Sequence, residues 1–249
     1  MLFPIRGAPA LRRQPWVTLG LIAANLAVFL YQLRLGPQAA AGLVLEKGAV
    51  AAKLSQPHLL FSYHGLSLLP TMFSSLFLHG GWVHLIGNMW FLWIFGEALE
   101  DDLGHGRFLA FFLFCGFFAG LFHVLWSSQL RAPLIGASGA IAGVLGGYLR
   151  RLPNSPIHTL ILFRLRPEMV PIPAFVWLGL WLVLQFYGLR QGGPVAWMAH
   201  LGGFFIGLVT VNLFTPAQAG RRQPTRKSGR KAKGKRSKAR SKARSMIQD

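Results

Sequence analysis

The sequence contains few charged residues and very few acidic ones. Only 13% of its 249 residues are charged, whereas 53% are hydrophobic and the mean hydropathy is +0.43. Soluble domains carry about a quarter charged residues, so this composition excludes an ordinary soluble domain and predicts a protein that lies in a lipid bilayer. A single cysteine, Cys115, excludes an intrachain disulfide. The length favours one helical membrane domain over two soluble domains.

Because acidic residues are scarce, the formal net charge is +19, from 26 lysines and arginines against 7 aspartates and glutamates. Half of the basic residues, 13 of the 26, lie between Arg221 and Arg244. Such a run cannot bury a core, so we expect residues 215–249 to form a disordered polybasic tail. The tail would anchor the topology or bind anionic lipid headgroups, and no specific nucleic-acid partner is expected.

Six long apolar stretches can each be interpreted as a membrane-spanning helix. We therefore predict an all-α polytopic membrane protein, with a six-helix bundle over residues 16–214 and a cytoplasmic segment over residues 1–15. The fourth helix would be short, because Ser138 to Leu149 covers about 18 Å against a hydrocarbon thickness of about 30 Å. A helix that begins below the membrane surface leaves a recess for water. The stretches are Trp16–Leu33, Met72–Leu99, Phe108–Trp126, Ala137–Leu149, Val170–Tyr187 and Val195–Phe214.

The distribution of basic residues predicts that both termini are cytoplasmic. In that orientation the inner segments carry 21 lysines and arginines and the outer segments 5, or 8 against 5 without the tail. We expect a multi-pass protein of a bacterial inner membrane. The first stretch could instead be a signal peptide cleaved near residues 39–41. In the outer connection 34–70, the sequence HLLFSYHGLSLLP is expected to lie in the membrane interface.

Four polar side chains in these stretches are predicted to lie at one depth. His84 and Asn88 are four residues apart and share a helix face. Ser138 lies at the start of the fourth stretch, and His200 lies near the start of the sixth. Because the second, fourth and sixth helices run in the same direction, all four side chains fall in the outer half of the bilayer. Polar groups inside membrane helices are costly and usually functional.

Small residues at four-residue spacing indicate how the fourth and sixth helices meet. Such faces let helix backbones approach closely in lipid. If the two faces pack together, Ser138 and His200 come within hydrogen-bond reach, and His200 can accept the proton of the serine. The small residues are Gly139 and Gly143 in one helix and Ala199, Gly203 and Gly207 in the other.

The sequence favours a Ser–His dyad, because all seven acids lie outside the apolar cores or at their ends. The backbone N–H groups at the start of the fourth helix, with His84 and Asn88, could stabilise an oxyanion. A metal site could be built from His79 and His84, but there is no HExxH motif and no carboxylate nearby. We therefore expect no metal and no cofactor.

Three motifs resemble those of the rhomboid family of intramembrane serine proteases. They are FLHGGWVHLIGNMWFLWIFGEALED, GASGAIAGVLGGY and AHLGGFFIG, in family order over most of residues 70–213. The resemblance implies a six-helix bundle whose site opens to extracytoplasmic water. It implies that Ser138 of the GxSG motif is the nucleophile and His200 of the AHxxG motif the base. His84 and Asn88, the HxxxN pair, would help the Ser138 amide to form the oxyanion hole.

The resemblance also covers residues around the site. His79 stands where the family has a histidine that supports the first external loop, and the motif glycines Gly136, Gly139 and Gly203 would support the site. Some relatives place a tyrosine one turn after the serine, where this chain has Ala142, so another residue must hold His200. The chain also lacks a Trp-Arg pair in the external loop.

The hypothesis is an intramembrane serine endopeptidase that cleaves transmembrane or membrane-adjacent protein segments. Its lateral surface toward the substrate would include Phe175, Trp177 and Trp181. Plainer interpretations remain, with Ser138 as a helix cap and the other polar residues as interhelical hydrogen bonds. Alternative functions are an inactive relative that binds membrane helices, or a transporter, for which no duplicated halves are seen.

The acids of GEALEDDLGHGRF are expected to be exposed.

Overall fold

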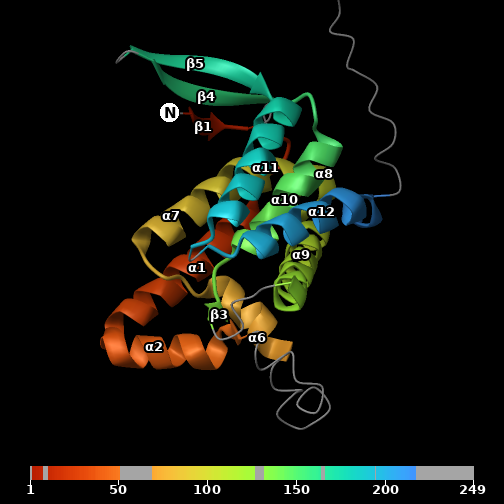
Figure 1. Ribbon diagram of the computed structural model, residues 1–249. Coiled ribbons are helices and arrows are strands. Elements are labelled where there is room, and N and C mark those ends of the chain that lie inside the picture. The colour runs from red at the N-terminus through yellow and green to blue at the C-terminus, as the bar shows by residue number, and fades with distance from the viewer. Residues whose placement is uncertain are drawn as a thin grey trace, which may run out of the picture. The chain divides into compact units, whose positions relative to one another are not determined.

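The described part of the chain is a helical bundle with a small sheet at one end (Figure 1). The computed structural model describes residues 2–7, 11–50, 69–126, 132–163, 166–193 and 195–216, and the residues up to Thr215 form one compact unit. The helices are α1 (Trp16–Arg34), α2 (Gly36–Lys47), α6 (Leu69–Ser74), α7 (Trp82–Phe91), α8 (Glu97–Leu103), α9 (His105–Trp126), α10 (Ser138–Arg151), α11 (Ala174–Gln191) and α12 (Trp197–Thr210).

Three short helical segments extend or join these helices. A π-helical turn, Leu92–Gly96, links α7 to α8, so residues 82–103 form one continuous helix. Ser75–Phe77 and Val211–Phe214 are 3₁₀ turns after α6 and α12. The strands are β1 (Leu2–Arg6), β2 (Ala49–Val50), β3 (Pro133–Leu134), β4 (Pro156–Phe163) and β5 (Arg166–Pro173).

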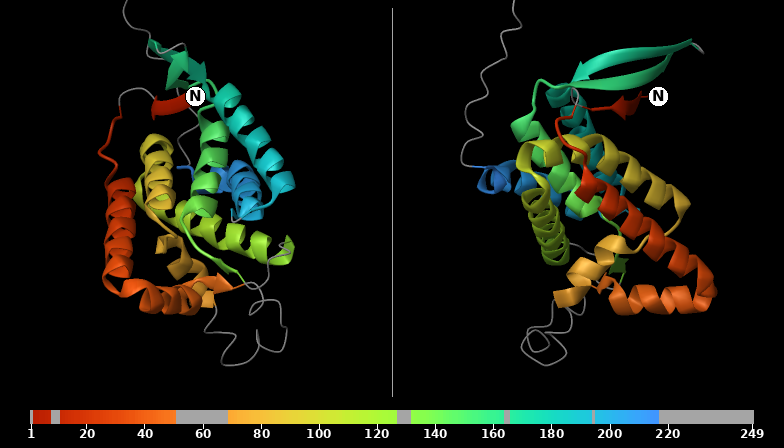
Figure 2. Two further views of the ribbon diagram at one scale, coloured as in Figure 1. Left: turned by 60° about the vertical axis from the view of Figure 1, so that its left-hand side comes forward. Right: turned by 180° about the vertical axis from the view of Figure 1, so that it is seen from behind.

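Helix α10 is the buried centre of the bundle, and the left view of Figure 2 shows it between α7 and α11. Every residue from Gly139 to Tyr148 is buried. The helix has 14 residues and is therefore about 21 Å long. The prediction of a short fourth helix is thus confirmed, although the helix ends two residues later than expected, at Arg151.

Glycines bring α10 and α12 into backbone contact. A Cβ atom placed on Gly203 would overlap the carbonyl oxygen of Gly139, and one on Gly207 would overlap that of Gly143. A Cβ on Gly146 would overlap the carbonyl oxygen of Phe204. The predicted packing of these two small-residue faces is therefore confirmed, because no larger side chain fits between the helices.

The outer faces of the helices are apolar, as expected for a protein in a bilayer. Large hydrophobic side chains such as Val83, Val209 and Leu213 are 89%, 75% and 80% exposed. Among the described residues, three helical segments are long and apolar enough by themselves to cross a membrane: Trp16–Arg34, His105–Trp126 and Trp197–Phe214. The count of six spans remains a prediction.

The second and fifth predicted stretches begin well before their helices do in the structure. The second predicted stretch begins at Met72, but its long helix begins only at Trp82, after a 3₁₀ turn and a glycine pair.

The predicted polybasic tail beyond Pro216 and most of the predicted interfacial segment lie outside the described residues. The domain boundaries at residues 15 and 214 remain predictions.

A three-stranded antiparallel sheet was not expected from the sequence. Its order is β1-β4-β5, with Phe3 opposite Leu160 and Ile157 opposite Ile172. The predicted start of the fifth helix at Val170 is therefore wrong. Val170 belongs to β5, and α11 starts at Ala174. The sheet joins the amino-terminal segment to the connection between α10 and α11.

Two acidic residues at the end of α8 form polar contacts with the start of α1 and the end of α10. The Glu100 carboxylate accepts hydrogen bonds from the backbone N–H groups of Val17 and Thr18, at 2.9 and 2.8 Å, and from the Thr18 hydroxyl at 2.7 Å. Asp102 forms an ion pair with Arg151 at 2.7 Å. The expectation of exposed acids is wrong, because Glu100 and Asp102 are 1% and 8% exposed and Glu97 and Asp101 are half-buried. Pro15 precedes α1 and has no side-chain cap, so Glu100 caps this helix instead.

Replacing Glu100 by Gln should therefore destabilise the bundle. The amide nitrogen would face an N–H or hydroxyl donor, and charge-assisted hydrogen bonds would be lost, at a cost of about 1.5–3 kcal/mol. Thermal unfolding in detergent micelles should show a clear fall in Tm. Glu46→Gln is the matched control, because the Glu46–Lys47 ion pair is exposed. Equal Tm values for the two variants would contradict this role of Glu100.

Candidate active site

A cavity of about 870 Å³ contains all four of the polar residues that were predicted to lie at one depth. His84 and Asn88 reach it from α7, Ser138 from the start of α10 and His200 from the first turn of α12. Its walls also include residues of α9, α11 and the connection before α10. The structure therefore brings these four residues to one place.

Ser138 is the first residue of α10, not its cap. The N-cap position is held by Ala137, whose side chain cannot accept a hydrogen bond. Among the described residues, no side-chain hydrogen bond uses the Ser138 hydroxyl, so the plainer interpretation as a helix cap does not apply.

Gly136 allows the chain to turn into α10 beside the imidazole of His84. Its φ of +105° favours glycine, and a Cβ atom there would lie 2.5 Å from His84 Nε2 and 3.4 Å from Asn88 Nδ2. The Gly136 N–H donates to the Ser75 carbonyl at 2.8 Å, which fixes the turn. The first turn of α10 and the two side chains of α7 therefore adjoin each other.

His200 is held by Gln185 of α11, a residue that the sequence analysis missed. His200 Nδ1 lies 2.8 Å from Gln185 Oε1, and Gln185 Nε2 donates to the Trp181 carbonyl at 3.1 Å. Because that carbonyl only accepts, the amide orientation is set, and Nδ1 must donate to Oε1. In the neutral ring, His200 Nε2 is then the unprotonated nitrogen. The ring of Trp197 lies edge-on to the imidazole at 5.9 Å, and Trp181 lies at 6.3 Å.

His84 presents an N–H group toward Gly136. The Gly80 N–H donates to His84 Nδ1 at 3.3 Å, so the proton of the neutral ring is on Nε2. Since Nε2 is also the atom nearest to a Cβ at Gly136, this N–H group lies beside the turn that leads into Ser138.

His79 lies behind the cavity and holds Asn88. Asn88 Nδ2 lies 2.9 Å from His79 Nε2, while His79 Nδ1 lies 3.4 Å from the Phe77 carbonyl. The side chain of Gln32 pairs with the backbone of His79, accepting at 3.1 Å and donating at 3.2 Å. His79 is 2% exposed and does not line the cavity. Gln32 of α1 is a second polar residue that the sequence analysis did not single out.

His123 of α9 also lines the cavity, and the sequence analysis did not single it out. It is 8% exposed, and its Nδ1 has no hydrogen-bond partner in the part of the chain that the structure describes. Its signal in the sequence is weak, because it stands near the end of an apolar stretch. No group of three or more His, Cys, Asp or Glu side chains suited to a metal ion occurs among the described residues.

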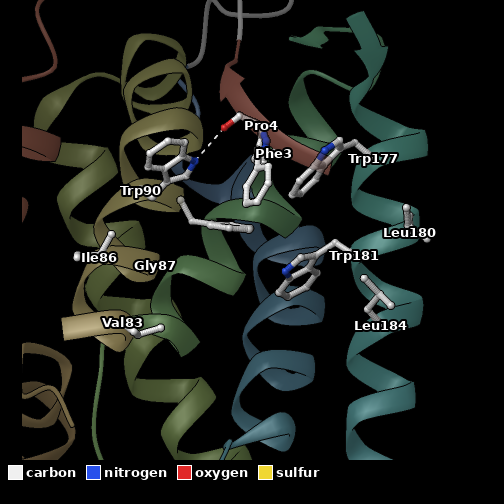
Figure 3. Close-up of a pocket in the computed structure, with 11 residues that line it drawn as sticks. Phe3, Pro4, Val83, Ile86, Gly87, Trp90, Trp177, Leu180, Trp181 and Leu184 are labelled. Atoms are coloured by element: carbon white, nitrogen blue, oxygen red, sulfur yellow. Dashed lines mark hydrogen bonds between the residues drawn. The ribbon is translucent and has the colours of Figure 1, made fainter. Parts of the chain in front are cut away.

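A second cavity of about 600 Å³ forms an apolar groove between α7 and α11 (Figure 3). It shares Val83, Gly87, Phe91 and Trp181 with the first cavity, so the two cavities lie next to each other. Trp177 and Trp181, predicted for a lateral surface, line this groove, whereas Phe175 does not line it.

A family model described as the Rhomboid domain matches residues 68–217, more than half of the chain. The chain belongs to the rhomboid family. The mitochondrial rhomboid protein 1 of Saccharomyces cerevisiae is 29% identical over 175 residues, which cover 67% of this chain and 43% of that protein. The chloroplastic rhomboid-like protein 11 of Arabidopsis thaliana is 31% identical over 175 residues, which cover 68% of this chain and 61% of that protein.

These relatives are longer than the matched region. RHOMBOID-like protein 5 of Arabidopsis thaliana is 38% identical over 81 residues, or 32% of this chain and 26% of that protein. The chain thus spans between about a quarter and three fifths of the length of these relatives. Family and composition show a helical membrane protein. The expected bacterial inner membrane gains no support, because two of these relatives are mitochondrial or chloroplastic by name.

Gly136→Ala should destabilise the chain and disturb the site. A methyl group would strain the backbone and push against the His84 ring, so we expect a loss of at least about 1 kcal/mol. The measurement is Tm in micelles. Gly106→Ala is the control, because a Cβ at Gly106 meets open space near the start of α9 and alanine favours a helix. A Gly136→Ala protein as stable as Gly106→Ala would contradict the described turn.

Proposed function

We propose that this rhomboid-family protein is an intramembrane serine endopeptidase, with Ser138 as nucleophile and His200 as general base. The observation that carries the proposal is the hydrogen bond from His200 to Gln185, which leaves Nε2 free to accept a proton in the cavity that Ser138 lines. The family supports this activity because its members are generally intramembrane serine proteases, although some are inactive.

In the proposed reaction, the Ser138 hydroxyl attacks a peptide carbonyl while His200 Nε2 takes the hydroxyl proton. The oxyanion would accept hydrogen bonds from the Ser138 amide, from His84 Nε2–H and from the second N–H of Asn88, which donates its first toward His79. His200 then protonates the leaving amine, and water hydrolyses the acyl-enzyme. Gly136, Gly139 and Gly203 would keep this arrangement compact.

The proposed substrates are transmembrane or membrane-adjacent segments of proteins. The groove between α7 and α11 is lined by exposed apolar side chains, and it shares four lining residues with the cavity that Ser138 lines. A segment leaving the lipid along this groove would not need to cross a polar surface. The predicted topology, with both termini cytoplasmic and a lipid-binding polybasic tail, is part of the same proposal.

Ser138→Ala and His200→Ala should each lower kcat for a model transmembrane substrate by at least about 10³-fold. Activity is measured with purified protein in detergent micelles. Ser155→Ala and His158→Ala are the controls. Ser155 directly precedes β4 and His158 lies in it, and neither residue lines the cavity. A fluorophosphonate probe should label the wild type and Ser155→Ala but not Ser138→Ala. Unlabelled wild type with no cleavage would favour an inactive relative that only binds membrane helices.

Gln185→Leu should lower kcat about 100-fold and leave KM nearly unchanged, because an imidazole that loses its acceptor can rotate away or take the other tautomer. Gln185→Glu keeps an acceptor for His200 Nδ1 but loses the donor to the Trp181 carbonyl, so it should restore part of the rate that Gln185→Leu loses. The test is a steady-state comparison of the three proteins. If Gln185→Leu and Gln185→Glu reduce kcat equally, Gln185 does not act by orienting His200.

A further inference from the structure

The amino-terminal strand closes one end of the groove between α7 and α11. Phe3 and Pro4 of β1 line that end beside Trp90 and Trp177, whereas Val83 and Leu184 lie at the other (Figure 3). The indole N–H of Trp90 donates to the Pro4 carbonyl at 2.8 Å.

The strand is fixed on both sides of the groove. Beyond Pro4, the buried Gly7 packs so closely that a Cβ there would lie 2.5 Å from the Ile94 carbonyl oxygen, in the helix that continues α7. On the other side β1 pairs with β4, β4 pairs with β5, and β5 runs directly into α11 at Ala174. The strand therefore ties α7 to α11 through hydrogen bonds at this end.

The opposite end of the groove has a different character. Val83 is 89% exposed and Leu184 is 54% exposed there, and in the described ranges no strand crosses from α7 to α11. Val83 and Gly87 also line the cavity that contains Ser138. Any widening between the two helices is thus easiest at the end that lies beside the cavity of Ser138.

We propose that β1 is a strap that determines which transmembrane segments can enter the groove. The strap keeps α7 and α11 together at its end, and Phe3 fills the space that a long rigid helix would need. A segment that unwinds near the open end can still reach Ser138. This inference rests on the proposed function, since it names the specificity of the same site.

The first test compares two substrates that share one cleavage sequence within a transmembrane segment. One segment is a leucine-rich helix, and the other carries a Gly-Pro pair beside the cleavage sequence, which breaks the helix. Phe3→Ala should raise kcat/KM for the rigid segment about tenfold and change it less than twofold for the broken one. Ile5→Ala is the matched control, because Ile5 is 40% exposed on the same strand and does not line the groove. An equal effect on both substrates would overturn the proposal.

The second test needs no cleavage. Spin labels on Ile86→Cys and Leu180→Cys, in a Ser138→Ala and Cys115→Ala background in lipid nanodiscs, report the distance between α7 and α11. Adding Trp90→Phe, which removes the donor to Pro4, should broaden the distance distribution, whereas adding Ile5→Ala should not. Unchanged distributions would refute the strap even in an active enzyme. If no variant cleaves any substrate, the proposed function fails, and the distances alone then decide the strap.

Discussion

The backbone contact between α10 and α12 positions the other parts of the site. Gly139 and Gly143 leave no room for a side chain opposite Gly203 and Gly207. In a bilayer the hydrophobic effect does not drive helices together, so this close fit supplies the packing energy. It also sets the relative height of the two helices and so brings Ser138 and His200 to one cavity.

Two separate sets of hydrogen bonds then orient the polar groups around that contact. Gln185 fixes the tautomer of His200 from α11, while Gln32 and His79 hold Asn88 from α1 and the loop before α7. Buried polar groups are costly in an apolar medium unless they are paired. The hydrogen bonds between these polar groups therefore support both stability and the proposed catalysis. Among the described imidazole nitrogens, only His123 Nδ1 is buried without a partner.

The sequence predicted the parts of the structure that follow from regular spacing. The short α10, its glycine face and the shared depth of His84 and Ser138 all depend on helical periodicity. Gln185 is polar inside an apolar stretch, but no local pattern indicates that it contacts His200 of another helix. The sheet was missed because β5 contains three prolines, which disfavour a strand, and because β1 is distant in sequence from its partner β4. The cap that Glu100 gives to α1 is likewise a contact between distant residues, which no local pattern reveals.

The start of α10 explains why a serine one position after the cap suits the proposed chemistry. The first N–H groups of a helix have no partner within it and are usually satisfied by a capping side chain. Here Ala137 is the N-cap and offers none, in contrast to α1, where Glu100 fills this role. The N–H groups beside Ser138 thus stay available to an oxygen of negative charge in the cavity, and the hydroxyl is not occupied by capping. A capping side chain in place of Ala137 would stabilise α10. It would also occupy the N–H donors on which the proposed reaction depends.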